Sequence, residues 1–184
     1  MTTKTFTDLQ LITNKTQNKM GREVRRVSKN WEHPKNDGNL KPLLGYSFTE
    51  TLKDWNEGNE QWNKGFIESR DDKNPWKKKE NDELEMTYEE WNGEKPVIED
   101  FMPEWKEEEK THIQMYEDTS EGTPISPVFD NAEDLAHWLA DNRASSFGSS
   151  TATYQQWLAT IKRGFAPSMV ADSNGVKSGV EALS

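Results

Sequence analysis

The chain has no cysteine in its 184 residues, and its apolar runs are short. Without cysteine there is no disulfide, and no thiolate for catalysis or metal binding, which permits a cytosolic protein. No run approaches the ~18 apolar residues of a membrane-spanning helix, so we expect no membrane association. Residues 1–11 lack both the apolar stretch and the small-residue cleavage site of a secretory signal, so we expect none.

Aliphatic residues are also scarce. Leu, Ile, Val and Phe number 31, about 17% of the chain, which is below the roughly 20% at which a highly charged chain is expected to be disordered. Against this stand eight tryptophans, each able to bury on the order of 150–250 Å². We therefore expect aromatic anchors to replace much of an aliphatic core.

The net charge of −10 is unevenly spread along the chain. Residues 1–50 hold nine Lys and Arg against five Asp and Glu, residues 51–121 hold ten against 22, and residues 122–184 hold four against six. Charge asymmetry of this kind is typical of interaction proteins. The alternative is internal pairing, in which the basic arm of Arg22, Arg25 and Arg26 docks onto the acidic middle.

Signatures of catalysis and of metal binding are missing from the sequence. The three histidines, His33, His112 and His137, show no metal-ligand spacing. His137 lies between Glu133 and Asp141 at helical spacing, which fits a charged helix surface as well as an acid or base. No phosphate-binding glycine loop is present. We expect no metal, no cofactor and no catalytic residue.

The pattern predicts a small, irregular, tryptophan-rich α+β domain with short helices, a small antiparallel sheet and a loop-rich N-terminal half. Helices are expected at 47–66, where Phe48, Leu52, Trp55 and Trp62 share a face, at 87–91, from a cap at 130–131 to Asn142, and at 153–163. Strands are expected at 112–116 and at 123–129, where two prolines favour a sheet edge.

Other segments are predicted from their turn residues and charge. Residues 21–27 read as a strand or a turn, and 36–39 as a turn. We expect loops at 68–85, anchored by Trp76, and at 144–153, and a hairpin at 167–180. The predicted division is a flexible leader at 1–20, a tryptophan-pinned region at 21–110 and a compact αβ region at 111–184, the last two forming one cooperative domain.

Two groups of residues are candidates for binding. The densest group of hydroxyl and acidic side chains is the turn at 117–126, whose backbone N–H groups can face an anion, although a plain turn between strands explains it equally. Tryptophans beside Pro, Lys or Glu in weakly patterned stretches are candidate contact residues. The candidates are Glu117, Asp118, Thr119, Ser120, Glu121, Thr123 and Ser126 in the turn, and Trp76, Trp91 and Trp105.

Several blocks of sequence resemble a family of uncharacterised proteins encoded by tailed bacteriophages and prophages. They are Gly-Arg-Glu-Val-Arg-Arg-Val at 21–27 with Trp31-x-His33-Pro34, the run at 115–129, and the segments 134–142 and 151–158. The resemblance implies a phage origin, expression in the cytoplasm of the bacterial host and a small accessory role. It implies no catalytic residue.

The leading hypothesis is a phage accessory protein, not an enzyme, that binds a host or phage macromolecule, most plausibly a protein. One version is an acidic inhibitor that mimics nucleic acid, since a duplex carries one charge per about 1.7 Å of axis. Nucleic acid itself is not the expected ligand. The alternatives are a small-ligand or nucleotide-binding protein that uses the loops 117–126 and 145–153, or a minor virion component.

Overall fold

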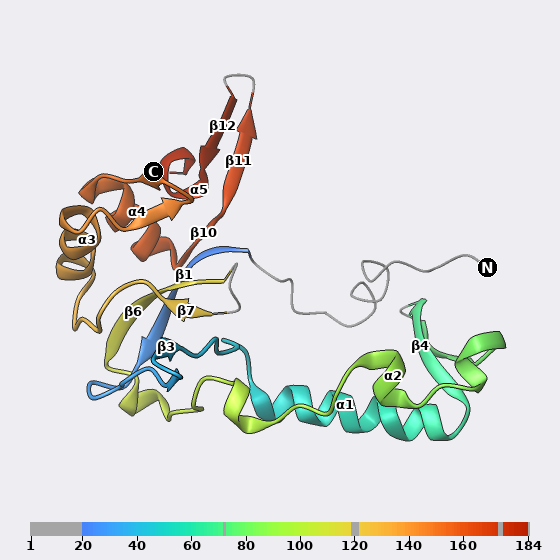
Figure 1. The fold of residues 1–184 in the computed structure, drawn as a ribbon. Helices are drawn as coiled ribbons and strands as arrows, with labels where there is room; N and C mark the ends of the chain where they lie inside the picture. The colour runs from blue at the N-terminus through green and yellow to red at the C-terminus, as the bar shows by residue number, and fades with distance from the viewer. Residues whose placement is uncertain (1–19, 72, 119–121, 173–174, 184) are drawn as a thin grey trace. The chain divides into compact units, whose positions relative to one another are not determined.

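The computed structural model describes residues 20–71, 73–118, 122–172 and 175–183, and the protein is an α+β protein of short helices and small antiparallel sheets (Figure 1). The described residues form two compact units. Tyr46–Phe101 make one, here called the inserted unit, and 20–45 with 102–183 make the other, the sheet unit. The predicted boundary near residue 110 lies inside the sheet unit, because the strand at 21–27 pairs with residues beyond 110.

The sheet unit is built on four antiparallel strands in the order β10-β1-β6-β7. They are β1 (Gly21–Val27), β6 (His112–Glu117), β7 (Thr123–Pro124) and β10 (Phe165–Pro167). The central pair, β1 and β6, sets Val24 opposite Met115. The predicted strand at 112–116 is confirmed. The predicted edge strand at 123–129 is confirmed as β7 with one further bridge between Ile113 and Phe129.

The two helices predicted in this unit are confirmed, and both are capped at their N-termini. Asn131 accepts a hydrogen bond from the Asp134 N–H at the start of α3 (Ala132–Asp141). Thr153 and Gln156 form a capping box before α4 (Tyr154–Arg163), which ends at Gly164 with φ 88°. A short helix, α5 (Gly179–Ala182), closes the chain. The main core lies between the helices and the sheet, with Trp157 fully buried and Trp138 half-buried beside it.

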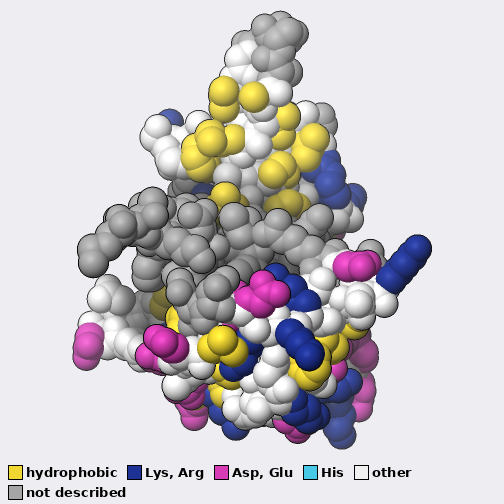
Figure 2. Space-filling model, turned by 90° about the vertical axis from the view of Figure 1, so that its right-hand side faces the viewer, with side chains coloured by type: hydrophobic (Ala, Val, Ile, Leu, Met, Phe, Trp, Pro, Cys, Tyr) yellow, Lys and Arg dark blue, Asp and Glu magenta, His cyan; other side chains and the backbone are white. Residues whose placement is uncertain are grey.

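Three hairpins complete the sheet unit. They are β2 (Lys35–Asn36) with β3 (Asn39–Leu40), β8 (Ser145–Phe147) with β9 (Ser150–Thr151), and β11 (Met169–Asp172) with β12 (Gly175–Ser178). The predicted turn at 36–39 and hairpin at 167–180 are confirmed. The predicted loop at 144–153 is wrong in that it contains β8 and β9, strands too short for an alternating pattern to show. Hydrophobic side chains gather on the face shown in Figure 2, and Met169 and Val176 of the last hairpin are more than half exposed.

The inserted unit begins with α1 (Phe48–Asn63), capped by Ser47, whose side chain accepts from the Glu50 N–H. The hairpin of β4 (Phe66–Asp71) and β5 (Asn74–Lys78) and the helix α2 (Tyr88–Asn92) follow. The predicted loop at 68–85 is therefore wrong over its first half. Lys77, Lys78 and Glu68 are exposed, so this hairpin carries none of the apolar alternation by which a strand is recognised.

The spacing Trp55-x-x-Gly58-x-x-x-Trp62 on α1 holds α2 in place. The Trp62 indole N–H donates to the Met86 carbonyl over 3.0 Å, and the Trp55 indole N–H donates to the Gly93 carbonyl over 3.2 Å. Those carbonyls flank α2 on either side. Between the two indoles, the ring of Tyr88 fills the space above Gly58 and packs edge-on against Trp55.

Candidate functional site

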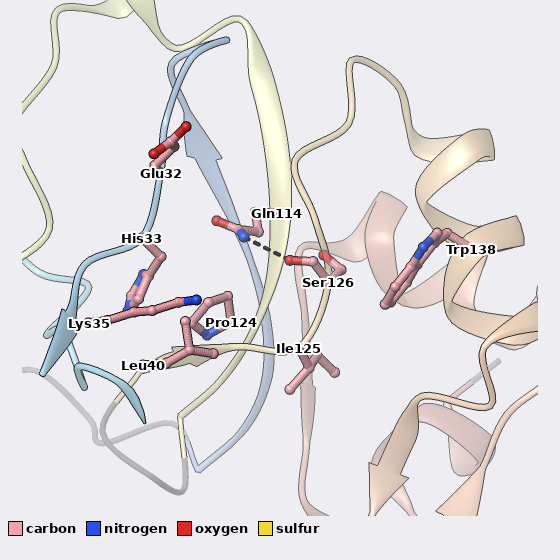
Figure 3. A pocket seen from close by; sticks show the side chains of 9 residues that line it. All are labelled: Glu32, His33, Lys35, Leu40, Gln114, Pro124, Ile125, Ser126 and Trp138. Atoms are coloured by element: carbon pink, nitrogen blue, oxygen red, sulfur yellow. Dashed lines mark hydrogen bonds between the residues drawn. The ribbon is translucent and has the colours of Figure 1, made fainter. Parts of the chain in front are cut away.

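A cavity of about 520 Å³ opens on the sheet unit between the β2–β3 hairpin and helix α3 (Figure 3). The strand β6 and the segment that follows β7 form its floor. Its walls mix apolar, aromatic and polar side chains, so it is suited to an amphipathic ligand. The lining residues are Glu32, His33, Lys35, Leu40, Gln114, Pro124, Ile125, Ser126 and Trp138.

A chain of hydrogen bonds fixes the polar floor of this cavity. The Trp31 indole N–H donates to the Tyr116 hydroxyl over 3.0 Å, and that hydroxyl donates to Oε1 of Gln114 over 2.8 Å. The other end of the Gln114 amide donates to the Ser126 carbonyl over 2.7 Å. Tyr116 is fully buried, and Gln114 is 5% exposed. Because both ends of the amide are engaged, its orientation is set before any ligand arrives.

His33 lies beside the same network and is held through Nε2. Nε2 lies 2.6 Å from the Lys41 carbonyl, so it carries the proton and donates, while Nδ1 lies 3.3 Å from the Tyr116 hydroxyl. Burial lowers the pKa of His33, against an opposing effect of the Lys41 carbonyl and with help from the charge of Arg25. Burial also raises the pKa of Tyr116 to about 12. Both groups are therefore neutral at pH 7.

Arg25 lies at the centre of a buried cluster of charges. Its guanidinium contacts Glu23 at 2.8 Å and Asp118 at 2.6 Å, and it donates to the Leu43 carbonyl over 2.8 Å. The same group lies 4.4 Å from the centre of the Tyr116 ring. Burial raises the pKa of Asp118 to about 6, helped by Glu23 and opposed by Arg25. With its donors engaged inside the fold, Arg25 ties the sheet to the segment before α1.

The other two arginines of the basic arm also pair internally. Arg22 is buried, donates to the Ser145 carbonyl over 2.8 Å and lies 3.4 Å from Glu117. It thereby joins the two segments, 117–126 and 145–153, that the small-ligand hypothesis requires to converge. Arg26 is exposed and pairs with Glu107 at 2.6 Å. The structure thus shows internal pairing for all three, and only Arg26 is left on the surface.

The candidates of the 117–126 turn are divided between different surroundings. Glu117 and Asp118 face the arginines, Ser126 lines the cavity, and Thr123 is half-buried in β7. Three further candidates, Thr119, Ser120 and Glu121, lie outside the described residues.

All eight tryptophans lie in the described part of the chain and are buried or half-buried, so they contribute to packing inside the protein. Of the three candidate contact residues, Trp105 packs edge-on against Trp31, with 5.0 Å between the ring centres. The ring centre of Trp91 lies 5.6 Å from that of Trp62. Trp76 is half-buried on β5, opposite Glu68. The structure therefore places them at three separate positions.

The exterior of the inserted unit is acidic. Fourteen of its acidic side chains are described and thirteen are exposed, against six exposed lysines. Glu50, Asp54 and Glu57 lie on one side of α1, because their spacing follows the helical repeat. Large apolar side chains are exposed in the same unit: Leu84 (65%), Val97 (50%) and Ile98 (61%).

Sequence reasoning missed most of the cavity. It found Ser126 but not Lys35, Gln114 or Trp138, because these come together only once the segment at 32–40 is placed beside β6 and α3.

Among the described residues, no group of three His, Asp or Glu side chains is arranged to hold a metal ion. None of the described helices is long and apolar enough to cross a bilayer. No protein-family model, curated protein or solved structure matches the chain.

Proposed function

We propose that the protein acts by binding a host or phage protein through the acidic exterior of its inserted unit, as a phage-encoded accessory factor in the host cytoplasm. The observation that carries this proposal is the thirteen exposed acidic side chains of that unit, set against six exposed lysines. Such an excess produces a negative field that attracts a basic partner and accelerates its association.

The exposed apolar side chains favour the interpretation that the exterior of the inserted unit contacts a partner, because a surface that only keeps the protein in solution has no need of them. Leu84, Val97 and Ile98 are at least half exposed, and apolar residues at the centre of an interface are those whose burial stabilises a complex. Nucleic acid would be repelled by the same field. A basic groove that normally binds nucleic acid has the complementary charge, which is the mimic version of this proposal.

The test is capture from a bacterial host lysate at graded salt, with two matched variants. Asp54→Asn with Glu57→Gln removes two charges from α1, and Glu108→Gln with Asp141→Asn removes two exposed charges from the sheet unit. We expect a captured protein that is lost as salt rises and is weakened by the α1 variant alone. The proposal would be contradicted if no protein is captured. It would also be contradicted if salt does not affect the capture and both variants capture the protein equally well.

The cavity of the sheet unit favours a second candidate function, the binding of a small ligand. Three of its lining residues, Pro124, Ile125 and Ser126, belong to the 117–126 segment. The lining includes no residue of the 145–153 segment, whose Ser145 carbonyl accepts a hydrogen bond from Arg22. A fragment screen read by protein NMR tests this function. Ligands that shift the Trp138 indole and Gln114 amide resonances support it, and a screen without such shifts removes it.

A further inference from the structure

We infer that the sheet-unit cavity binds an amphipathic monocarboxylate, a molecule with an apolar or aromatic body and one carboxylate end. This inference rests on the second candidate function and names its ligand class. It follows from three features of the lining: an apolar wall, a cation that forms no ion pair with the described residues, and an amide donor fixed in position.

The apolar wall comes from both sides of the cavity. Leu40 on the β2–β3 hairpin and Ile125 after β7 provide aliphatic surface, and the indole of Trp138 on α3 lies across from them (Figure 3). Leu40 is 38% exposed. A flat apolar body between these side chains would remove their exposed surface from water, which favours binding.

The cation is Lys35. Its side chain points from β2 toward the other lining residues in Figure 3. Lys35 forms no ion pair with any described residue. Glu32, the one carboxylate in the lining, lies apart from it, beyond His33 in the view. A ligand carboxylate can therefore approach the ammonium without displacing a protein carboxylate.

The fixed donor is the side-chain amide of Gln114. One Nε2 hydrogen is donated to the Ser126 carbonyl, and the second has no acceptor among the described residues. The Tyr116 hydroxyl donates to Oε1, so the amide cannot turn over without losing that bond. A buried N–H held in this way offers a ligand oxygen a hydrogen bond at little cost in side-chain order.

Together the donors set the ligand's charge. One ammonium matches a single carboxylate, and the Gln114 amide N–H, which lies apart from the ammonium in Figure 3, can donate to a polar atom elsewhere on the ligand. A nucleotide would bring two or more phosphate charges to a cavity with one lysine and one glutamate in its lining. The monoanion with an apolar body is therefore the class that fits both halves of the lining.

The experiment is a titration of the full chain with naphthalene-1-acetate and, in parallel, with its neutral analogue naphthalene-1-acetamide, followed by calorimetry and by the amide spectrum. Three variants accompany the wild type. Lys35→Met removes the cation and keeps the stem, Lys29→Met is the control at an exposed lysine outside the lining, and Ile125→Ala trims the apolar wall.

We expect the carboxylate to bind at least three-fold more tightly than the amide. Lys35→Met should remove that preference by weakening carboxylate binding three- to five-fold, which is the scale of an exposed ion pair. Lys29→Met should keep the preference. Ile125→Ala should weaken the binding of both probes. Equal binding of the two probes in the wild type, or equal behaviour of the two lysine variants, overturns the ligand class alone. No binding of either probe at millimolar concentration overturns the small-ligand function as well.

Discussion

The phenol oxygen of Tyr88 occupies the place where a side chain on Gly58 would begin, since a Cβ at Gly58 would lie 2.0 Å from it. The glycine that lowers the helix propensity of α1 is thus the residue that admits α2. This explains an otherwise unfavourable glycine in the middle of a 16-residue helix.

Gly58→Ala tests this contact. Alanine favours a helix by about 1 kcal/mol over glycine, yet we expect Gly58→Ala to lower the free energy of unfolding by about 1–3 kcal/mol, because the methyl group overpacks against Tyr88. Urea unfolding of the full chain measures it. Adding Tyr88→Phe, which removes the nearest atom, should recover part of the loss. A Gly58→Ala protein that is more stable than the wild type would show that Tyr88 moves aside freely.

Tyr116→Phe tests the network beneath the cavity. Loss of the hydroxyl leaves the Trp31 indole N–H and Gln114 Oε1 without their partner. We expect a loss of about 2–4 kcal/mol in unfolding free energy, since each unsatisfied buried group costs about 1–3 kcal/mol. Tyr154→Phe is the control, because its ring stacks on His137 and no hydrogen bond of its hydroxyl is described. Equal effects of the two substitutions would contradict the network.

The half-buried carboxyl of Asp118 predicts a pH dependence of stability. Its pKa is raised from 3.8 to about 6 by burial and by Glu23, against Arg25, and Arg22 also faces it. The folded protein therefore binds more protons than the unfolded chain between about pH 4 and pH 6, so this group makes stability fall as pH rises through that window. Urea midpoints of wild type and Asp118→Asn, measured from pH 4 to pH 7, should diverge in that sense. A constant difference between them would show that the carboxyl titrates normally.

The two arginines with different surroundings should respond differently to removal. Arg26→Met breaks an ion pair in which both partners are more than half exposed, so we expect a change below about 1 kcal/mol that vanishes at high salt. Arg22→Met removes a buried side chain that joins Ser145 to Glu117, and we expect a loss of about 2–4 kcal/mol that salt does not erase. Thermal or urea unfolding at 0.05 and 1 M salt separates the cases. A comparable loss for both would contradict the assignment of burial.

Elements with a local signal could be predicted from the sequence. Ser47, Thr87 and Asn131 each accept the hydrogen bond that caps a predicted helix. The helix predicted at 153–163 is α4, and the structure shows Thr153 as its cap. Helices depend on contacts between residues three and four apart, so the sequence pattern that predicts a helix lies within one short stretch of chain.

The hairpin β4–β5 and the cavity could not be predicted in this way. The hairpin carries charged, exposed side chains, so no apolar alternation marks it. The cavity depends on the pairing of β1 with β6, where Arg25 lies opposite Gln114. Nothing near either residue indicates the other, because strand partners are chosen by the whole fold.

The pairing of β1 with β6 also bears on how the chain is made. The first residue of β6, His112, is 85 positions after Val27, the last residue of β1. A ribosome adds about 5–20 residues per second, so β1 is made roughly 4–17 seconds before β6 begins. The second partner of β1, which is β10, is made later still. Near the end of this interval the inserted unit has all its own residues, whereas β1 still has none of its partners. A chain that ends before residue 112 and is released from the ribosome should therefore protect 46–101 from protease and leave 21–27 open to cleavage.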